Sequence, residues 1–137
     1  MYNVLLLTHG SLAEKFKDTL GMFISNKDYV YAVGLKESGI QKFTDEVCNT
    51  IENIYSEENG VLILADLYGG TPFNVAVKEI KSKYNNVEII AGLNLPMLVE
   101  ACLMRDNDLK TVSDIMMGNK ENYISRFEMC TVNEDDE

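Results

Sequence analysis

Basic residues are scarce in this chain. It has 12 Lys and Arg residues against 22 Asp and Glu residues, which gives a formal net charge of −10 at pH 7. Binding to nucleic acid or to anionic lipid surfaces draws much of its affinity from basic groups that neutralise phosphates, so the sequence predicts a protein that binds neither. Part of the acidic excess lies in residues 133–137, which we expect to be a frayed, solvated tail.

Cysteine pairs and long apolar runs are also missing. Cys48, Cys102 and Cys130 are far apart and form no C-x-x-C motif, which indicates inert thiols in a reducing compartment rather than a disulfide or a metal site. No run approaches the ~18–20 apolar residues of a membrane span, and no basic region precedes the first apolar run as in a signal peptide. We expect a cytoplasmic protein with no membrane insertion, no metal and no other cofactor.

Apolar runs alternate in this chain with segments of helical period, and its 137 residues suit one domain, which we place at 1–132. The expected strands are Val4–Leu7, Tyr29–Val33, Val61–Ala65 and Val87–Ala91. The expected helices are Ser11–Ile24, a helix capped by Ser38 and ending at Ile54, a helix with Thr71 as N-cap and Pro72 as first residue, Met97–Met104 and Thr111–Met117. Tyr123–Val132 is a candidate edge strand.

This alternation predicts an α/β fold with a doubly wound, mainly parallel, flavodoxin-like sheet of strand order 2-1-3-4. Ligands of such sheets bind at the carboxyl ends of the strands, where the strand order reverses. That point lies between the first and third strands, which are followed by Thr8-His9-Gly10 and by Asp66-Leu-Tyr-Gly-Gly-Thr-Pro-Phe-Asn74. We therefore expect these two segments to meet in one crevice.

His9 is the only histidine of the chain. A single histidine is more often structural than catalytic, so its position has to decide between the two. Neutral imidazole is available as a nucleophile near pH 7, and the end of the first strand would present it in the predicted crevice. We therefore take His9 as the candidate nucleophile.

Asp66 directly follows an apolar run, where a carboxylate can simply end a strand. Alternatively, it accepts the Nδ1–H of His9, which would fix the tautomer and leave the Nε2 lone pair free. Beyond it, the N–H groups of Gly69 and Gly70 and the hydroxyl of Thr71 can cradle a phosphoryl group, although capping explains Thr71 equally well. A nucleophile, an orienting carboxylate and an anion site together indicate phosphoryl transfer.

Three further residues are expected to line the pocket or to face partners: Tyr68, Phe73 and Asn94, the last equally well explained by a helix start. Other proteins of this fold class fit less well. A receiver domain would need an acid pair after the first strand to hold magnesium, and a histidine phosphatase would have Arg where Thr8 stands. A flavodoxin would have a longer, Ser/Thr-rich phosphate loop there.

The motifs Thr8-His9-Gly10, Asp66–Asn74 and Ala91–Glu100, in this order, resemble the enzyme IIA component of the mannose-type sugar phosphotransferase system. The resemblance covers Met1 to Asp106. It implies a phosphotransferase that is phosphorylated on Nε2 of His9. This protein would accept the phosphoryl group from the histidine-containing phosphocarrier protein and pass it to an enzyme IIB component during sugar uptake. The same likeness implies that Asp66 orients His9 and that Thr71 binds the phosphate.

The resemblance also implies a homodimer that exchanges a C-terminal strand, for which Tyr123–Val132 is the candidate. Because the chain ends without a IIB domain, we expect IIB on a separate polypeptide. Two alternatives stay open: the phosphoryl-donor subunit of dihydroxyacetone kinase, and a regulatory domain of the same fold. The intact set of His9, Asp66 and Thr71 argues against a regulatory domain, and the runs Gly69–Asn74 and Asn94–Leu98 resemble the transport branch.

Overall fold

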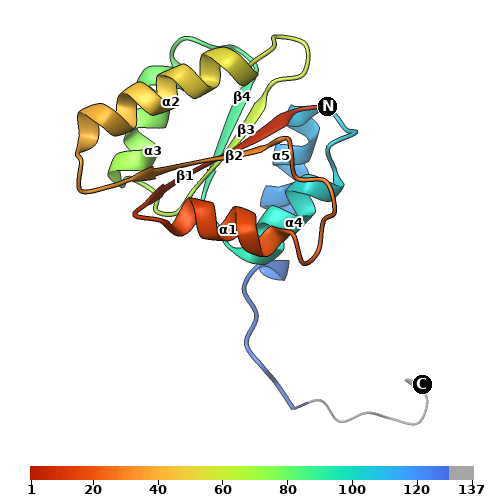
Figure 1. Cartoon of the computed structure of the whole chain (residues 1–137). Coiled ribbons are helices and arrows are strands. Elements are labelled where there is room, and N and C mark those ends of the chain that lie inside the picture. Colours follow the sequence, from red (N-terminus) through yellow and green to blue (C-terminus); the bar gives the residue numbers. More distant parts are fainter. Residues whose placement is uncertain (130–137) are drawn as a thin grey trace.

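A parallel sheet of four strands in the order β2-β1-β3-β4 forms the centre of the protein, as predicted (Figure 1). The computed structural model describes residues 1–129; Cys130 and the acidic segment 133–137 lie outside the described residues. The strands are β1 (Asn3–His9), β2 (Val30–Leu35), β3 (Val61–Ala65) and β4 (Val87–Ala91). The predicted strands fall within these ranges apart from Tyr29, since each apolar run is long enough to cross a sheet covered on both faces.

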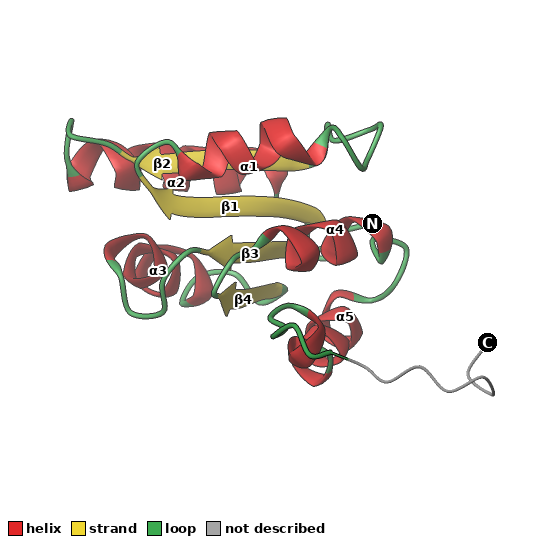
Figure 2. Cartoon of the chain, turned by 90° about the horizontal axis from the view of Figure 1, so that it is seen from below, coloured by secondary structure: helices red, strands yellow, loops and turns green. Residues whose placement is uncertain are grey.

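Helices cover both faces of the sheet (Figures 1 and 2). They are α1 (Leu12–Leu20), α2 (Ile40–Ile54), α3 (Thr71–Val75), the π-helical η1 (Ala76–Lys81), α4 (Leu95–Leu103), α5 (Leu109–Gly118) and the short η2 (Lys120–Asn122). Buried side chains of α1, α4 and α5 pack on one face, and those of α2, α3 and η1 pack on the other. Within residues 1–129, no helix is long and apolar enough to cross a membrane.

The central strand β1 divides the core in two. Val4 and Leu6 belong to the cluster under α1, α4 and α5, whereas Leu5 and Leu7 belong to the cluster under α2, α3 and η1. Successive side chains of a strand point to opposite faces, so an uninterrupted apolar run supplies both cores at once. This burial fixes the end of β1, and with it the position of His9.

Two predicted helix starts are wrong by one residue. Gly39, not Ser38, is the N-cap of α2, and Gly70, not Thr71, is the N-cap of α3, so that Thr71 is already helical. An apolar period locates a helix but fixes its first residue poorly. The helix predicted over Ser11–Ile24 ends at Leu20.

The burial of α3 and η1 also differs from a regular helical stripe. We expected Phe73, Ala76, Val77 and Ile80 to face inward; Ala76 and Ile80 are buried, but Phe73 is only half-buried and Val77 is 43% exposed. The chain changes to wider π-helical turns at Ala76, which moves the following side chains off the 3.6-residue period.

No strand forms over Tyr123–Met129, so the predicted C-terminal edge strand is absent from the described part of the chain, and residues 130–132 lie outside it. After Tyr123 the chain runs away from the body (Figure 1), and no strand of residues 1–129 pairs with it. Ile124, Phe127 and Met129 are each more than 80% exposed.

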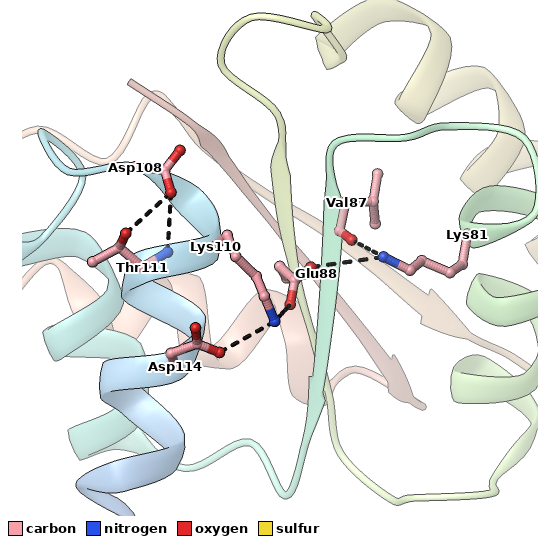
Figure 3. A network of polar contacts seen from close by, with 7 residues as sticks. All are labelled: Lys81, Val87, Glu88, Asp108, Lys110, Thr111 and Asp114. Carbon is pink, nitrogen blue, oxygen red and sulfur yellow. Dashed lines mark hydrogen bonds and ion pairs between the residues drawn. The ribbon is translucent and has the colours of Figure 1, made fainter.

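A polar network fastens β4, an edge strand of the sheet, to its neighbours (Figure 3). The Glu88 carboxylate lies 3.7 Å from Lys81 Nζ of η1 and 3.9 Å from Lys110 Nζ of α5. Lys110 also pairs with Asp114 at 3.2 Å, and Asp108 caps α5 by accepting the N–H of Thr111. Charged side chains on an edge strand discourage unwanted pairing.

Candidate active site at the carboxyl ends of β1 and β3

His9 is the last residue of β1, and its side chain is 43% exposed. The strand pairs with β3 as far as Leu7 and Ala65, and the Asp66 N–H still donates to the Leu7 carbonyl at 3.3 Å. Parallel pairing in this register places Asp66 opposite Thr8, within reach of His9. The structure thus brings together the two segments that the sequence predicted to meet.

The Asp66 carboxylate binds both the ring and the backbone of His9. Its Oδ2 lies 2.9 Å from His9 Nδ1 and accepts the His9 backbone N–H, also at 2.9 Å. Its Oδ1 accepts the N–H of Leu67 at 2.9 Å. An ionised carboxylate can only accept hydrogen bonds, so the proton of the neutral imidazole resides on Nδ1, and Nε2 carries a lone pair.

The Asp66 side chain is only 10% exposed, yet it is ionised. Burial alone raises the pKa of this carboxyl group, but the hydrogen bonds from the backbone and ring of His9 outweigh that effect and lower the pKa below its usual value. Asp66 therefore keeps its negative charge near neutral pH and can stabilise positive charge on the imidazole ring.

The glycine turn after β3 packs against the imidazole. A Cβ atom on Gly70 would lie 2.9 Å from His9 Cε1, closer than side chains pack, so a hydrogen at this position gives the ring its space. The Gly70 N–H, which we expected to bind phosphate, donates to the Leu67 carbonyl at 3.2 Å instead. Gly70 therefore contributes space for the ring, and its N–H is engaged within the turn.

Several donors of this turn find no acceptor within residues 1–129. They are the backbone N–H groups of Gly69, Thr71 and Phe73 and the hydroxyl of Thr71. Thr71 lies half-buried at the start of α3 and lines an open hollow of about 300 Å³ together with Ile40 and Asn74. Free donors in such a turn are suited to bind an anion.

Thr8 is a positioning residue for which the sequence reasoning had no role. Its hydroxyl is completely buried and accepts the N–H of Ala13 at 2.8 Å, so it caps α1 in place of Ser11, whose side chain makes no capping bond. This bond fixes the turn that follows His9. The only hint in the sequence was a polar residue at the end of an apolar run.

The remaining predicted residues occupy two places. Tyr68 is 83% exposed and contacts Phe73 in a tilted arrangement, with ring centroids 4.5 Å apart. The two residues line a hollow of about 380 Å³ beside Asp66. Asn94 caps α4 by accepting the N–H of Met97 at 3.1 Å, and it donates to the Tyr123 carbonyl at 3.0 Å. The Asn94 amide therefore links the start of α4 to the chain after η2. Residues 1–129 contain no cluster of His, Cys, Asp and Glu side chains that could hold a metal ion.

Comparison with known proteins identifies the family of this chain. Residues 3–117 match the family described as PTS system fructose IIA component. The PTS fructose-specific EIIA component of Bacillus subtilis is 30% identical over 132 residues, which cover 96% of this chain and 88% of that protein. The PTS mannose-specific EIIAB component of Escherichia coli K12 is 33% identical over 110 residues, which cover 77% of this chain but 32% of that protein.

Comparison with solved structures finds proteins of the same system. The mannose/sorbose specific IIA subunit of the phosphotransferase system from Enterococcus faecalis superposes with a TM-score of 0.78, covering 96% of this chain and 98% of that one at 22% identity. At this identity the likeness supports the fold. The family match and the B. subtilis relative extend over nearly the whole described chain, and the chain belongs to the mannose-type enzyme IIA family of the sugar phosphotransferase system.

Proposed function

We propose that this protein carries a phosphoryl group on Nε2 of His9, which it accepts from the histidine-containing phosphocarrier protein and donates to an enzyme IIB component. The observation that carries the proposal is the hydrogen bond of 2.9 Å between His9 Nδ1 and Asp66 Oδ2, made by a half-exposed imidazole. It keeps the proton on Nδ1 and presents a free lone pair on Nε2 to a partner. Family membership supports the same chemistry.

The transfer needs no group beyond those at the site. The Nε2 lone pair of His9 attacks the phosphorus of the phosphorylated carrier; the new N–P bond forms as the old one breaks, and the electron pair of that bond returns to the carrier. The ring gains positive charge while Nδ1 keeps its proton, and the Asp66 carboxylate stabilises that charge. The reverse sequence passes the group to IIB.

Free donors for the phosphoryl oxygens lie in the turn whose Gly70 comes close to the His9 ring. The Thr71 hydroxyl and the N–H groups of Gly69 and Thr71 make no other hydrogen bond among residues 1–129. Phosphoryl transfer depends mainly on positioning and on stabilising charge over the oxygens. We assign the binding of the phosphoryl group to these donors, with Gly70 giving space to the imidazole.

Partners would dock at the same edge of the sheet. Exposed apolar side chains follow β1, β2 and β3 there: Leu12, Ile40, Leu67 and Tyr68. Apolar side chains around a reactive group suit a docking surface that excludes water from the transfer. For the expected homodimer, the exposed Ile124, Phe127 and Met129 supply an apolar segment that a second copy would cover.

A transfer assay with the radiolabelled, phosphorylated carrier tests the proposal. We expect label on the protein that is labile in acid and stable in base, as for phosphohistidine, and no label on a folded His9→Ala variant. Label that persists in His9→Ala would refute the assignment. Chasing the labelled protein with an enzyme IIB component, and separately with a dihydroxyacetone kinase subunit, distinguishes the two branches; we expect transfer to IIB, since the relatives named above are sugar-specific components.

A further inference from the structure

Asn74 binds both residues of the glycine turn beside His9. Its side-chain Nδ2 donates to the Gly69 carbonyl at 3.0 Å, and its backbone N–H donates to the Gly70 carbonyl at 2.9 Å. The second bond is the ordinary first bond of a helix. The first is not, because in a regular α-helix the Gly69 carbonyl would accept the N–H of Phe73.

The hydrogen bond from the Asn74 side chain to the Gly69 carbonyl replaces a backbone hydrogen bond in a flexible part of the chain. Gly69 has a φ of +80°, and two consecutive glycines have more conformational freedom than any other pair of residues. A hydrogen bond from the following helix limits that freedom. Without the Asn74 amide, the Gly69 carbonyl has no other donor among the described residues.

The position of this turn determines the space open to the imidazole. Asp66 holds the ring at Nδ1, and Gly70 lies against Cε1, the atom between the two ring nitrogens. A single hydrogen bond at Nδ1 leaves the ring free to rock. The close approach of Gly70 to Cε1 limits that movement on one side, and with it the direction of Nε2.

We propose that Asn74 is a positioning residue that holds the Gly69–Gly70 turn against His9 and thereby aims Nε2 at the incoming phosphorus. The proposal rests on the function proposed above, and it assigns Asn74 no contact with the phosphoryl group. A merely structural role would predict lower stability in Asn74 variants with an unchanged imidazole and an unchanged transfer step.

The test compares Asn74→Ala with Asn86→Ala as a matched control. Asn86 also donates a side-chain amide to a backbone carbonyl, that of Glu57 at 3.0 Å, but it precedes β4 and so lies at the opposite ends of the strands from His9. Asn74→Asp serves as a second variant, because it keeps the size of the side chain and replaces the donor with an acceptor. All variants are used as the full chain.

Two readouts separate positioning from folding. Because His9 is the only histidine, imidazole nitrogen NMR reports its ring alone. Steady-state transfer from the phosphorylated carrier gives kcat and KM. We expect both Asn74 variants to lower kcat about tenfold with KM within about twofold, the order expected for a shift of less than 1 Å. We also expect them to broaden or shift the His9 ring signals, whereas Asn86→Ala matches the wild type in both readouts.

Wild-type kcat and ring signals in Asn74→Ala would overturn the proposal, and so would equal effects of Asn74→Ala and Asn86→Ala. The NMR readout does not depend on phosphorylation. If the wild type took no label on His9, the proposed function would fail while the ring signals still decided the role of Asn74.

Discussion

The substitution Asp66→Asn tests the orientation of His9 most sharply, because it changes one atom and forces a choice between two hydrogen-bonding patterns. With its carbonyl oxygen toward His9, Asn keeps the bonds to Nδ1–H and to the His9 backbone but opposes its NH₂ to the N–H of Leu67. The Leu67 N–H then loses its acceptor, but it is exposed and can turn to water. With the amide turned round, the NH₂ faces Nδ1, and the imidazole proton has to move to Nε2.

Both patterns impair transfer. The second blocks the nucleophilic nitrogen with a proton, and both remove the negative charge that stabilises the phosphorylated ring. In a serine protease triad the corresponding change lowers kcat about 10⁴-fold. Since His9 reacts here with an already activated phosphoryl donor, we expect a reduction of about 10²–10⁴-fold, or about 2.7–5.4 kcal/mol in the barrier.

Single-turnover transfer from the labelled carrier measures this effect. Asp114→Asn is the matched control, because Asp114 pairs with the exposed Lys110 on α5, in the network on the far side of β4, and has no contact with His9. We expect the control to transfer at the wild-type rate. A wild-type rate in a folded Asp66→Asn variant would refute the orienting role of the carboxylate.

Three further predictions concern the surroundings of His9. Gly70→Ala keeps an allowed backbone but puts a methyl group against His9 Cε1; it should fold and lose transfer about 10-fold or more, and an unchanged rate would mean that the ring does not need this space. Thr8→Val leaves the N–H of Ala13 unpaired and should cost about 1–2 kcal/mol in urea unfolding, against little change for Thr8→Ser. Because the pKa of Asp66 is lower in the folded protein, its charge should stabilise the wild type relative to Asp66→Asn above about pH 4. This advantage should disappear as the pH falls further, through the folded pKa, and unfolding at several pH values checks it.

The sequence was sufficient to predict the sheet. The expected strands are mainly apolar, as in Val61–Ala65, and they alternate with segments of helical period, which favours a parallel sheet covered on both faces; 2-1-3-4 is the common order for four such units. The same reasoning placed His9 and Asp66 at one edge, because Asp66 directly follows one apolar run and His9 comes two residues after another. In the structure the two side chains are joined by a hydrogen bond of 2.9 Å. Predicting that they lie close together required only the strand ends and no knowledge of side-chain packing.

The contacts that shape the site were not predictable, because they join residues through turns rather than along a period. Thr8 caps α1 from inside the preceding strand, which no cap pattern indicates. Asn74 reaches back five positions to a carbonyl that the helix would otherwise use. Asn94 looked like a pocket residue because it follows β4, and only the structure shows its amide bound to Met97 and Tyr123.

The C-terminal segment shows another reason why sequence-based prediction of a strand can fail. Tyr123–Met129 has the apolar content of a strand, but a strand forms only where an edge is available to pair with it. No strand of residues 1–129 pairs with it, and Ile124, Phe127 and Met129 stay exposed. Sedimentation of the protein at micromolar concentration checks the expected dimer; a clear monomer would contradict it.

Nitrogen and phosphorus NMR of the phosphorylated protein tests the central claim most directly, because the chain has one histidine and hence one imidazole to observe. We predict that phosphorus is bound to Nε2 and that the Nδ1 proton remains hydrogen-bonded to Asp66. Phosphorus on Nδ1, or on any residue other than His9, would contradict the account.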